Sequence, residues 1–158
     1  MTRTEVSRVS FYSIAMMTVT SVHHIYGALI YNTPWRLQIL IASFPMIIFC
    51  VIWNRLAVKE KSNFLVWFLS AMIFIFSICL VGGYEGIYNH LLKNILFFAG
   101  LNDSMLLKLF PPPTYVMPND FIFELTGCLQ ALIFFPNAYY FFQWVMKGKH
   151  AVNESVLK

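Results

Sequence analysis

The sequence predicts an all-α polytopic membrane protein: a four-helix bundle whose third and fourth spans are joined by an interfacial amphipathic segment. Hydrophobic residues make up 59% of the chain and charged residues only 11%, whereas soluble domains contain about 25% charged residues. The apolar residues gather in four stretches, each about as long as the ~20 residues that a helix needs to cross a bilayer. The basic residues flank these stretches and form no patch, so we expect the lipid bilayer as a partner and no nucleic acid.

The first two spans are separated by a short turn. The first is expected at residues 9–31 and ends at the turn signal Asn32-Thr33-Pro34. We expect it to be retained, because it is too long for a signal-peptide core and has no small-residue cleavage site. The second span is expected at residues 34–53, since Pro34 suits the first position of a helix.

The last two spans are expected at residues 64–88 and 121–146, which makes the chain one integral membrane domain over 1–158. The outer loop between them covers residues 89–120. Its apolar part, 91–109, contains interspersed polar residues, a pattern that is typical of an interfacial amphipathic helix. A re-entrant hairpin is the alternative for this segment.

The distribution of basic residues predicts the orientation, because these residues favour the cytoplasmic side of short loops. Most of them lie at the two termini and in the loop between the second and third spans: Arg3, Arg8, Arg55, Lys59, Lys61, Lys147, Lys149 and Lys158. The two remaining loops hold only Arg36, Lys93 and Lys108. Four spans with both termini in the cytoplasm satisfy this distribution.

Ionisable residues from three spans are expected at a common level near the non-cytoplasmic face. His23 and His24 lie about two turns below the outward end of the first span. Glu85 lies near the outward end of the third span with His90 just beyond it, and Glu124 lies about one turn inside the start of the fourth. An ionisable residue is costly in a membrane span, so this grouping indicates a functional site.

Helical periodicity ranks these residues by the direction in which they face. His24 shares its face with small and polar residues, which favours it over His23 as the inward-facing histidine. Glu85 and His90 lie more than a third of a turn apart on a regular α-helix. One ion could therefore contact both only if the helix were distorted, and Gly82-Gly83 is the expected place for that distortion.

The face of the fourth span that carries Glu124 also holds small residues, which permit the close approach of a neighbouring helix. They are Gly127, Cys128 and Ala131. We therefore expect this face to pack toward the centre of the bundle.

A metal site is the leading functional hypothesis. Imidazole and carboxylate groups from several helices suit zinc, iron or copper ions, and the expected ligands are His24, His23, Glu85, His90 and Glu124. Such an ion could activate water or oxygen toward a hydrophobic small molecule that enters from the bilayer. The sequence does not decide whether the protein is an enzyme, because it contains no phosphate-binding loop, no nucleophile elbow and no Glu-x-x-His pair.

A b-type haem electron carrier is an alternative, with His90 and either His23 or His24 as axial ligands. The glycines of the third span and the many aromatic residues would suit a porphyrin. Adjacent histidines point in different directions, so only one of the two in the first span could serve.

A structural role is a further alternative, in which Glu85 or Glu124 pairs with a cation to define the helix register. The partners within reach are Arg36, His24 and Lys93. The protein would then be a non-catalytic accessory or assembly subunit of a larger membrane complex. Transport is the remaining class, but four spans enclose little aqueous volume and a homo-oligomer would be needed.

Overall fold

The computed structural model describes the backbone of residues 3–57, 64–112 and 117–156 and the side chains of 4–57, 64–112 and 117–146. All regular structure in these ranges is helical: α1 (Arg3–Ile30), η1 (Pro34–Gln38), α2 (Ile39–Ala57), α3 (Phe64–Met72), η2 (Ile73–Leu92), α4 (Lys93–Phe98), α5 (Asp103–Leu109) and α6 (Phe121–Val156). The basic residues Lys59, Lys61 and Lys158 and the side chains of Lys147 and Lys149 lie outside the described residues.

The prediction of four long apolar helices is confirmed. The stretches that are long and apolar enough to cross a membrane are Thr4–Ile30, Pro34–Ala57, Phe64–Phe98 and Phe121–Met146. The first helix begins and the second helix ends a few residues outside the predicted bounds. Which side of the membrane holds the termini stays a prediction.

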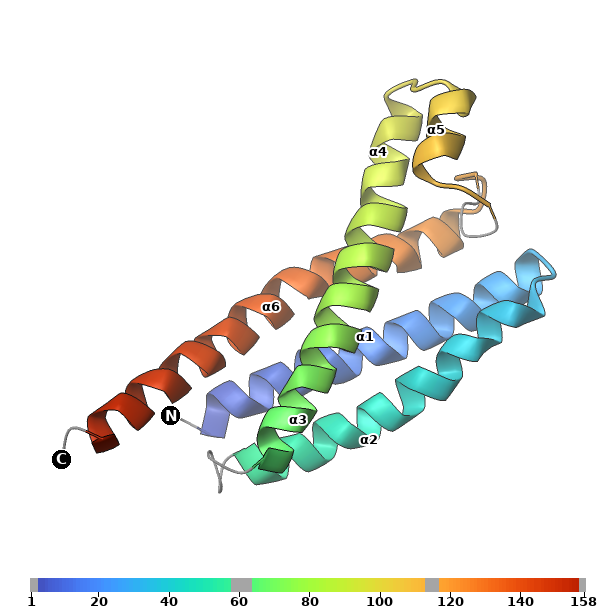
Figure 1. Ribbon diagram of the computed structural model, residues 1–158. Coiled ribbons are helices and arrows are strands. Elements are labelled where there is room, and N and C mark those ends of the chain that lie inside the picture. The colour runs from blue at the N-terminus through green and yellow to red at the C-terminus, as the bar shows by residue number, and fades with distance from the viewer. Residues whose placement is uncertain (1–2, 58–63, 113–116, 157–158) are drawn as a thin grey trace.

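The third long helix extends beyond its predicted end at residue 88. It combines α3, η2 and α4 without a break over Phe64–Phe98. Figure 1 shows it crossing the other three helices at a steep angle and rising past their ends. The prediction of a single interfacial helix at 91–109 is therefore wrong, because the first half of that segment belongs to the third long helix.

The second half of the predicted 91–109 helix forms α5, which folds back beside α4 (Figure 1). The chain turns at Gly100, whose φ of +84° is readily adopted only by glycine. Asn102 then caps α5, since its Oδ1 accepts a hydrogen bond of 3.0 Å from the Met105 N–H. The Tyr88 hydroxyl donates to the Leu109 carbonyl and so ties the end of α5 to η2.

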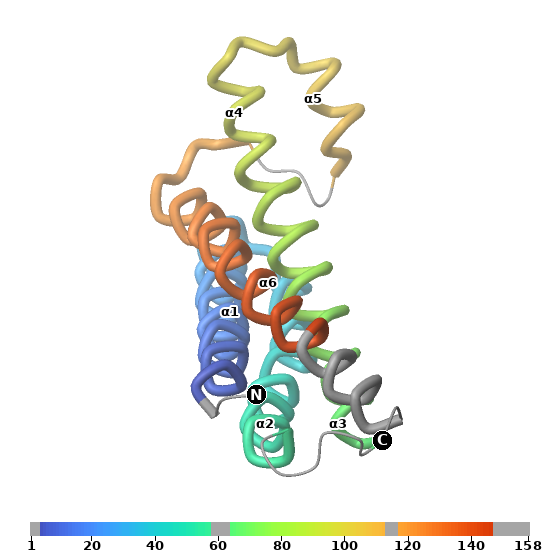
Figure 2. The backbone as a smooth tube through the Cα atoms, turned by 90° about the vertical axis from the view of Figure 1, so that its left-hand side faces the viewer, coloured from blue at the N-terminus to red at the C-terminus, as the bar shows by residue number. Residues whose placement is uncertain are grey.

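Helix α6 packs along both η2 and α1, and α1 packs in turn against α2. Figure 2 shows these helices grouped together, with the α4–α5 hairpin projecting beyond them. Side-chain hydrogen bonds join the helices: Ser13 donates to Asn137 Oδ1 at 3.1 Å, and the Asn137 amide donates to Ser77 at 2.9 Å. These two hydrogen bonds link α1, α6 and η2. Such contacts help to hold helices together in lipid, where the hydrophobic effect between helices is weak.

The middle of the third long helix is wound more widely than an α-helix. Segment η2 is a π-helix, in which hydrogen bonds join residues five apart. The sequence predicted a distortion at Gly82-Gly83, and the wide winding includes that position. Gly86, one turn further along, packs so closely on α6 that a Cβ there would lie 2.6 Å from the Ala131 backbone nitrogen. The small-residue face of α6 therefore packs inward, as predicted.

Replacing Gly86 with alanine should destabilise the protein, because the added methyl group would force η2 and α6 apart. We expect the free energy of unfolding to fall by about 1–3 kcal/mol. Gly83 provides the matched control, since a Cβ there meets nothing closer than 3.4 Å. Gly83→Ala should leave stability unchanged or raise it by up to about 1 kcal/mol. Denaturant titration in micelles measures both, and equal effects would contradict the close packing at Gly86.

Candidate metal centre

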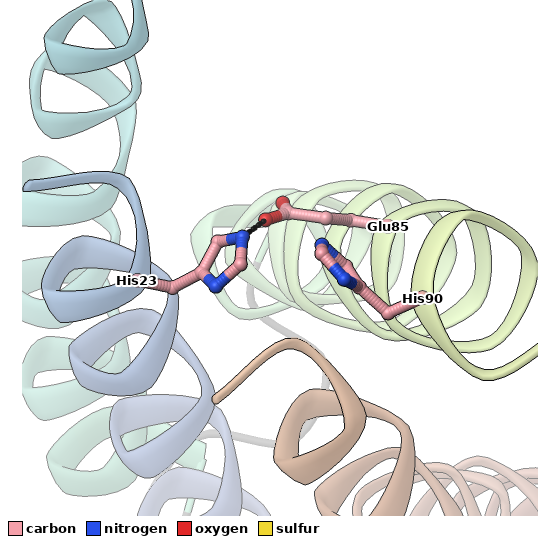
Figure 3. Close-up of side chains that lie close together, drawn as sticks. All are labelled: His23, Glu85 and His90. Carbon is pink, nitrogen blue, oxygen red and sulfur yellow. Dashed lines mark ion pairs between the residues drawn. The ribbon is translucent and has the colours of Figure 1, made fainter. Parts of the chain in front are cut away.

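Three ligand-type side chains converge between α1 and η2. His23 comes from α1, whereas Glu85 and His90 come from η2, and one potential ligand atom from each lies within 4.8 Å of the others. Figure 3 shows the two imidazole rings and the carboxylate turned toward one another. His23 is 1% exposed and His90 is 3% exposed. We call these three residues the His-Glu-His cluster.

The wide winding of η2 lets Glu85 and His90 share one side of the helix. They are five residues apart, and residues five apart lie on nearly the same face of a π-helix. On a regular α-helix, the same spacing would turn one of them away by more than a third of a turn. Figure 3 shows both side chains leaving the same side of the helix toward His23. The local helix type therefore creates the cluster.

The proton of the His23 ring is held on the side away from the cluster. His23 Nδ1 lies 2.9 Å from the Thr126 hydroxyl oxygen, and that hydroxyl has its single hydrogen directed at the backbone of its own helix, with the Ile122 carbonyl at 2.8 Å and the Phe123 carbonyl at 3.0 Å. Thr126 must then accept, so we assign the proton to Nδ1 of His23. The lone pair on Nε2 consequently faces Glu85, with 3.8 Å between Nε2 and Oε1.

The His90 ring is oriented in the same way by an ion pair. Its Nδ1 lies 3.0 Å from Glu124 Oε2, and the Lys93 ammonium donates to Glu124 Oε1 at 3.1 Å. A carboxylate can only accept, so a neutral His90 ring carries its proton on Nδ1 and leaves Nε2 as a lone pair. The His90 ring meets the His23 ring edge to face, with centroids 4.6 Å apart.

The Glu85 carboxylate is held by donors from two neighbouring helices. His24 Nε2 lies 2.9 Å from Oε1, and the Gln130 amide donates to the same oxygen at 3.2 Å. The Thr20 hydroxyl donates to Oε2 at 3.2 Å. These contacts fix the carboxylate while one side of it still faces the two histidine lone pairs.

The structure brings all five predicted site residues together, and three of them form the cluster. His24 and Glu124 each lie one hydrogen bond away, on Glu85 and His90 respectively. His24 was expected to face inward in preference to His23, and the structure reverses that order. The side chain of His24 is 15% exposed, whereas His23 is 1% exposed and stacks on Phe123 with centroids 4.1 Å apart. The cause is that α1 packs against α6 as well as η2, so two of its faces are covered.

The predicted ion pairs are found in two of the three cases. Glu85 pairs with His24 and Glu124 pairs with Lys93. Sequence reasoning did not assign roles to Thr20 and Thr126, which orient the cluster from α1 and α6. The available signal was spacing: Thr20 lies one turn before His24, and Thr126 lies on the turn that carries Glu124.

The described residues do not indicate a haem. The edge-to-face contact of His23 and His90 leaves no slot between the rings for a porphyrin plane. His24, the other proposed axial ligand, is directed at Glu85.

A pocket of about 210 Å³ opens beside the cluster. Its polar wall contains the His-Glu-His cluster and Arg36, and the rest is largely apolar and aromatic, with Leu80, Val81 and Trp35 among the lining residues. The cluster is therefore open to a space that a further molecule could enter.

Comparisons with protein-family models, curated proteins and solved structures found no match for this chain. Its function therefore rests on the chemistry and geometry of the site.

The hydrogen-bond network predicts which nitrogen carries the proton in metal-free protein when the rings are neutral. His23 and His90 should both be protonated at Nδ1, because Thr126 and Glu124 accept from that atom. Nitrogen-15 NMR of labelled histidine distinguishes the two tautomers. Thr126→Val should remove the preference at His23 but not at His90, and Thr126→Ser should preserve both. A proton on Nε2 of either ring in the unmodified protein would contradict the assignment.

Proposed function

We propose that this chain is an integral membrane metalloprotein that binds one divalent transition-metal ion through His23, Glu85 and His90. The observation that carries the proposal is the pair of hydrogen bonds that orient the two imidazole rings. Both imidazole protons are held on the outer sides of the rings, by Thr126 and Glu124, and both Nε2 atoms are left for the cluster. Three acceptors that face one buried point repel one another, and a cation at that point removes the repulsion.

The distances support an ion of this kind. Two donors at about 2.0–2.2 Å from a tetrahedral ion lie about 3.4 Å apart. His23 Nε2 and Glu85 Oε1, at 3.8 Å, are within about half an ångström of that separation. A pair at the 4.8 Å limit of the cluster would have to close by about 1.4 Å, which requires rotation of the side chains.

The donor set favours zinc or iron over copper. Two imidazoles and one carboxylate form a catalytic zinc set and also the facial set of non-haem iron(II). The cluster contains no thiolate or thioether, which would favour copper(I). Three protein ligands leave a coordination position open toward the pocket. An ion there would polarise or activate a molecule bound beside it, and we propose a hydrophobic small molecule from the bilayer as the substrate class.

The surrounding hydrogen bonds support metal binding rather than a simple ion pair. Metal-bound histidines commonly donate their second N–H to a carboxylate or another acceptor, which fixes the ring. His90 donates to Glu124 and His23 donates to Thr126 in this way. An ion pair between Glu85 and His24 alone would not require the other two rings to present lone pairs to the same carboxylate.

Purified protein should contain one zinc or iron ion per chain after metal supplementation, as measured by mass spectrometry of the elements. Glu85→Gln should lose the ion, because a neutral amide is a poor ligand of nearly the same size. Asp103→Asn on α5 is the matched control and should retain it. An unmodified protein without stoichiometric metal would refute the proposal. Unchanged metal in Glu85→Gln together with loss of a partner subunit would instead favour the accessory-subunit role.

Glu124→Gln should weaken metal binding without abolishing it, since Glu124 orients His90 and does not belong to the cluster. We expect the metal affinity to fall about 10–100-fold, in line with the loss of other groups that orient a metal-bound histidine. Lys93→Met is the control, because it leaves the His90–Glu124 hydrogen bond in place. Competition with a chelating indicator gives both affinities. A loss as complete as that of Glu85→Gln would show that Glu124 is itself a ligand.

A further inference from the structure

Arg36 is a buried cation at the wall of the pocket. Its exposed fraction is 5%, although it lies in the short η1 helix near the end of the bundle. The guanidinium is held by a hydrogen bond of 2.9 Å from Nε to the Thr33 hydroxyl. Aromatic rings surround it, with the guanidinium carbon 4.9 Å from the Trp35 ring and 5.2 Å from the Phe123 ring. These contacts hold the group in one place.

No carboxylate lies within ion-pair distance of Arg36 among the residues that the structure describes. The nearby Tyr31 does not supply a negative charge, because a phenol is neutral at physiological pH. The Nε–Thr33 bond also leaves the two terminal nitrogens of the guanidinium for another acceptor. A buried charge without a counter-ion is costly, so this arrangement is expected where an anionic ligand completes it.

Arg36 and the His-Glu-His cluster line the same pocket. Phe123 contacts both groups: its ring stacks on His23 of the cluster and also lies beside the Arg36 guanidinium. An anionic group bound at Arg36 would therefore lie next to the open position of the proposed metal ion. The planar guanidinium matches a carboxylate or a phosphate, both of which accept paired hydrogen bonds.

The remainder of the pocket suits an apolar body rather than a small soluble anion. The lining residues Trp35, Leu80 and Tyr84 are 42%, 48% and 52% exposed on the apolar outer surface of the bundle. The volume of about 210 Å³ is smaller than the ~300–1,000 Å³ of pockets that enclose a drug-sized molecule. A head group and its first carbons fill such a space, and the rest of the molecule must extend along the outer surface.

We propose that this pocket binds an anionic amphiphile, with its carboxylate or phosphate on Arg36 and its apolar chain across Leu80 and Trp35. The inference builds on the proposed metal site, because it names the class of molecule that would lie beside the ion. The binding itself depends on Arg36, so it is measurable in metal-free protein.

Binding of radiolabelled oleate to the protein in phosphatidylcholine nanodiscs tests the proposal. We expect saturable binding that dodecyl phosphate displaces, whereas dodecanol and inorganic phosphate do not. Arg36→Gln should weaken oleate binding about tenfold or more, since it removes hydrogen bonds to a charged group. The affinity of Arg36→Lys for oleate should lie between those of the unmodified protein and Arg36→Gln, because lysine keeps the positive charge but cannot form the paired hydrogen bonds of the guanidinium. Arg55 is exposed and lies at the end of α2 that is far from η1, so Arg55→Gln should bind oleate as tightly as the unmodified protein does.

The source of the amphiphile is tested by adding phosphatidic acid to the nanodiscs. Displacement of oleate assigns the site to a bilayer lipid, and its failure assigns it to a free single-chain amphiphile. Unchanged affinity in Arg36→Gln, or equal displacement by dodecanol, would overturn the proposal. Metal analysis of the same samples separates the two ideas. Arg36-dependent binding without stoichiometric metal would refute only the metal site, and metal without oleate binding would refute only this inference.

Discussion

The winding of η2 is the constraint on which the rest of the site depends. A helix with hydrogen bonds between residues five apart directs Glu85 and His90 to the same side. Close packing of η2 on α6 at Gly86 then holds that side against the neighbouring helices. Without the wide turn, the two side chains would diverge and His23 would face only one of them. Helices of this kind are rare, and π-helical turns are frequently found at functional sites.

Much of the fold follows from apolar stretch length, but the site depends on features that such patterns do not contain. Four long helices and the inward small-residue face of α6 were predictable, because bilayer thickness and close packing leave few alternatives. The 91–109 segment was mispredicted because its apolar residues suit a continued span as well as an interfacial helix, and the turn at Gly100 decides between them. His24 was predicted to be the inward-facing histidine, but His23 is the more buried of the two. Helical periodicity describes one helix at a time, whereas neighbouring helices cover α1 on more than one face.

The two proposed sites share a polar layer whose members form hydrogen bonds across three helices, although His24 Nδ1 and Gln130 Oε1 are buried without a partner among the described residues. Glu124 accepts from His90 and Lys93, and Glu85 accepts from His24 and Gln130. Glu124 thus combines a structural pairing with the orientation of His90, and Glu85 combines a structural pairing with a place in the His-Glu-His cluster. The structural and functional interpretations of these acids are therefore compatible, since the pairing that defines helix register also defines the direction of the lone pairs.

The pairing of Lys93 with Glu124 has a consequence for charge neutrality. These two groups cancel each other, so among the described pocket residues Glu85 is left as the carboxylate that would face both the proposed divalent ion and the Arg36 guanidinium. One negative charge cannot balance the positive charges of the proposed ion and of Arg36. A net positive region in a medium of low polarisability attracts anions strongly. An ion-loaded form of the protein would therefore hold an acidic molecule more tightly than the empty form does, so that the metal and its neighbour would each promote the retention of the other.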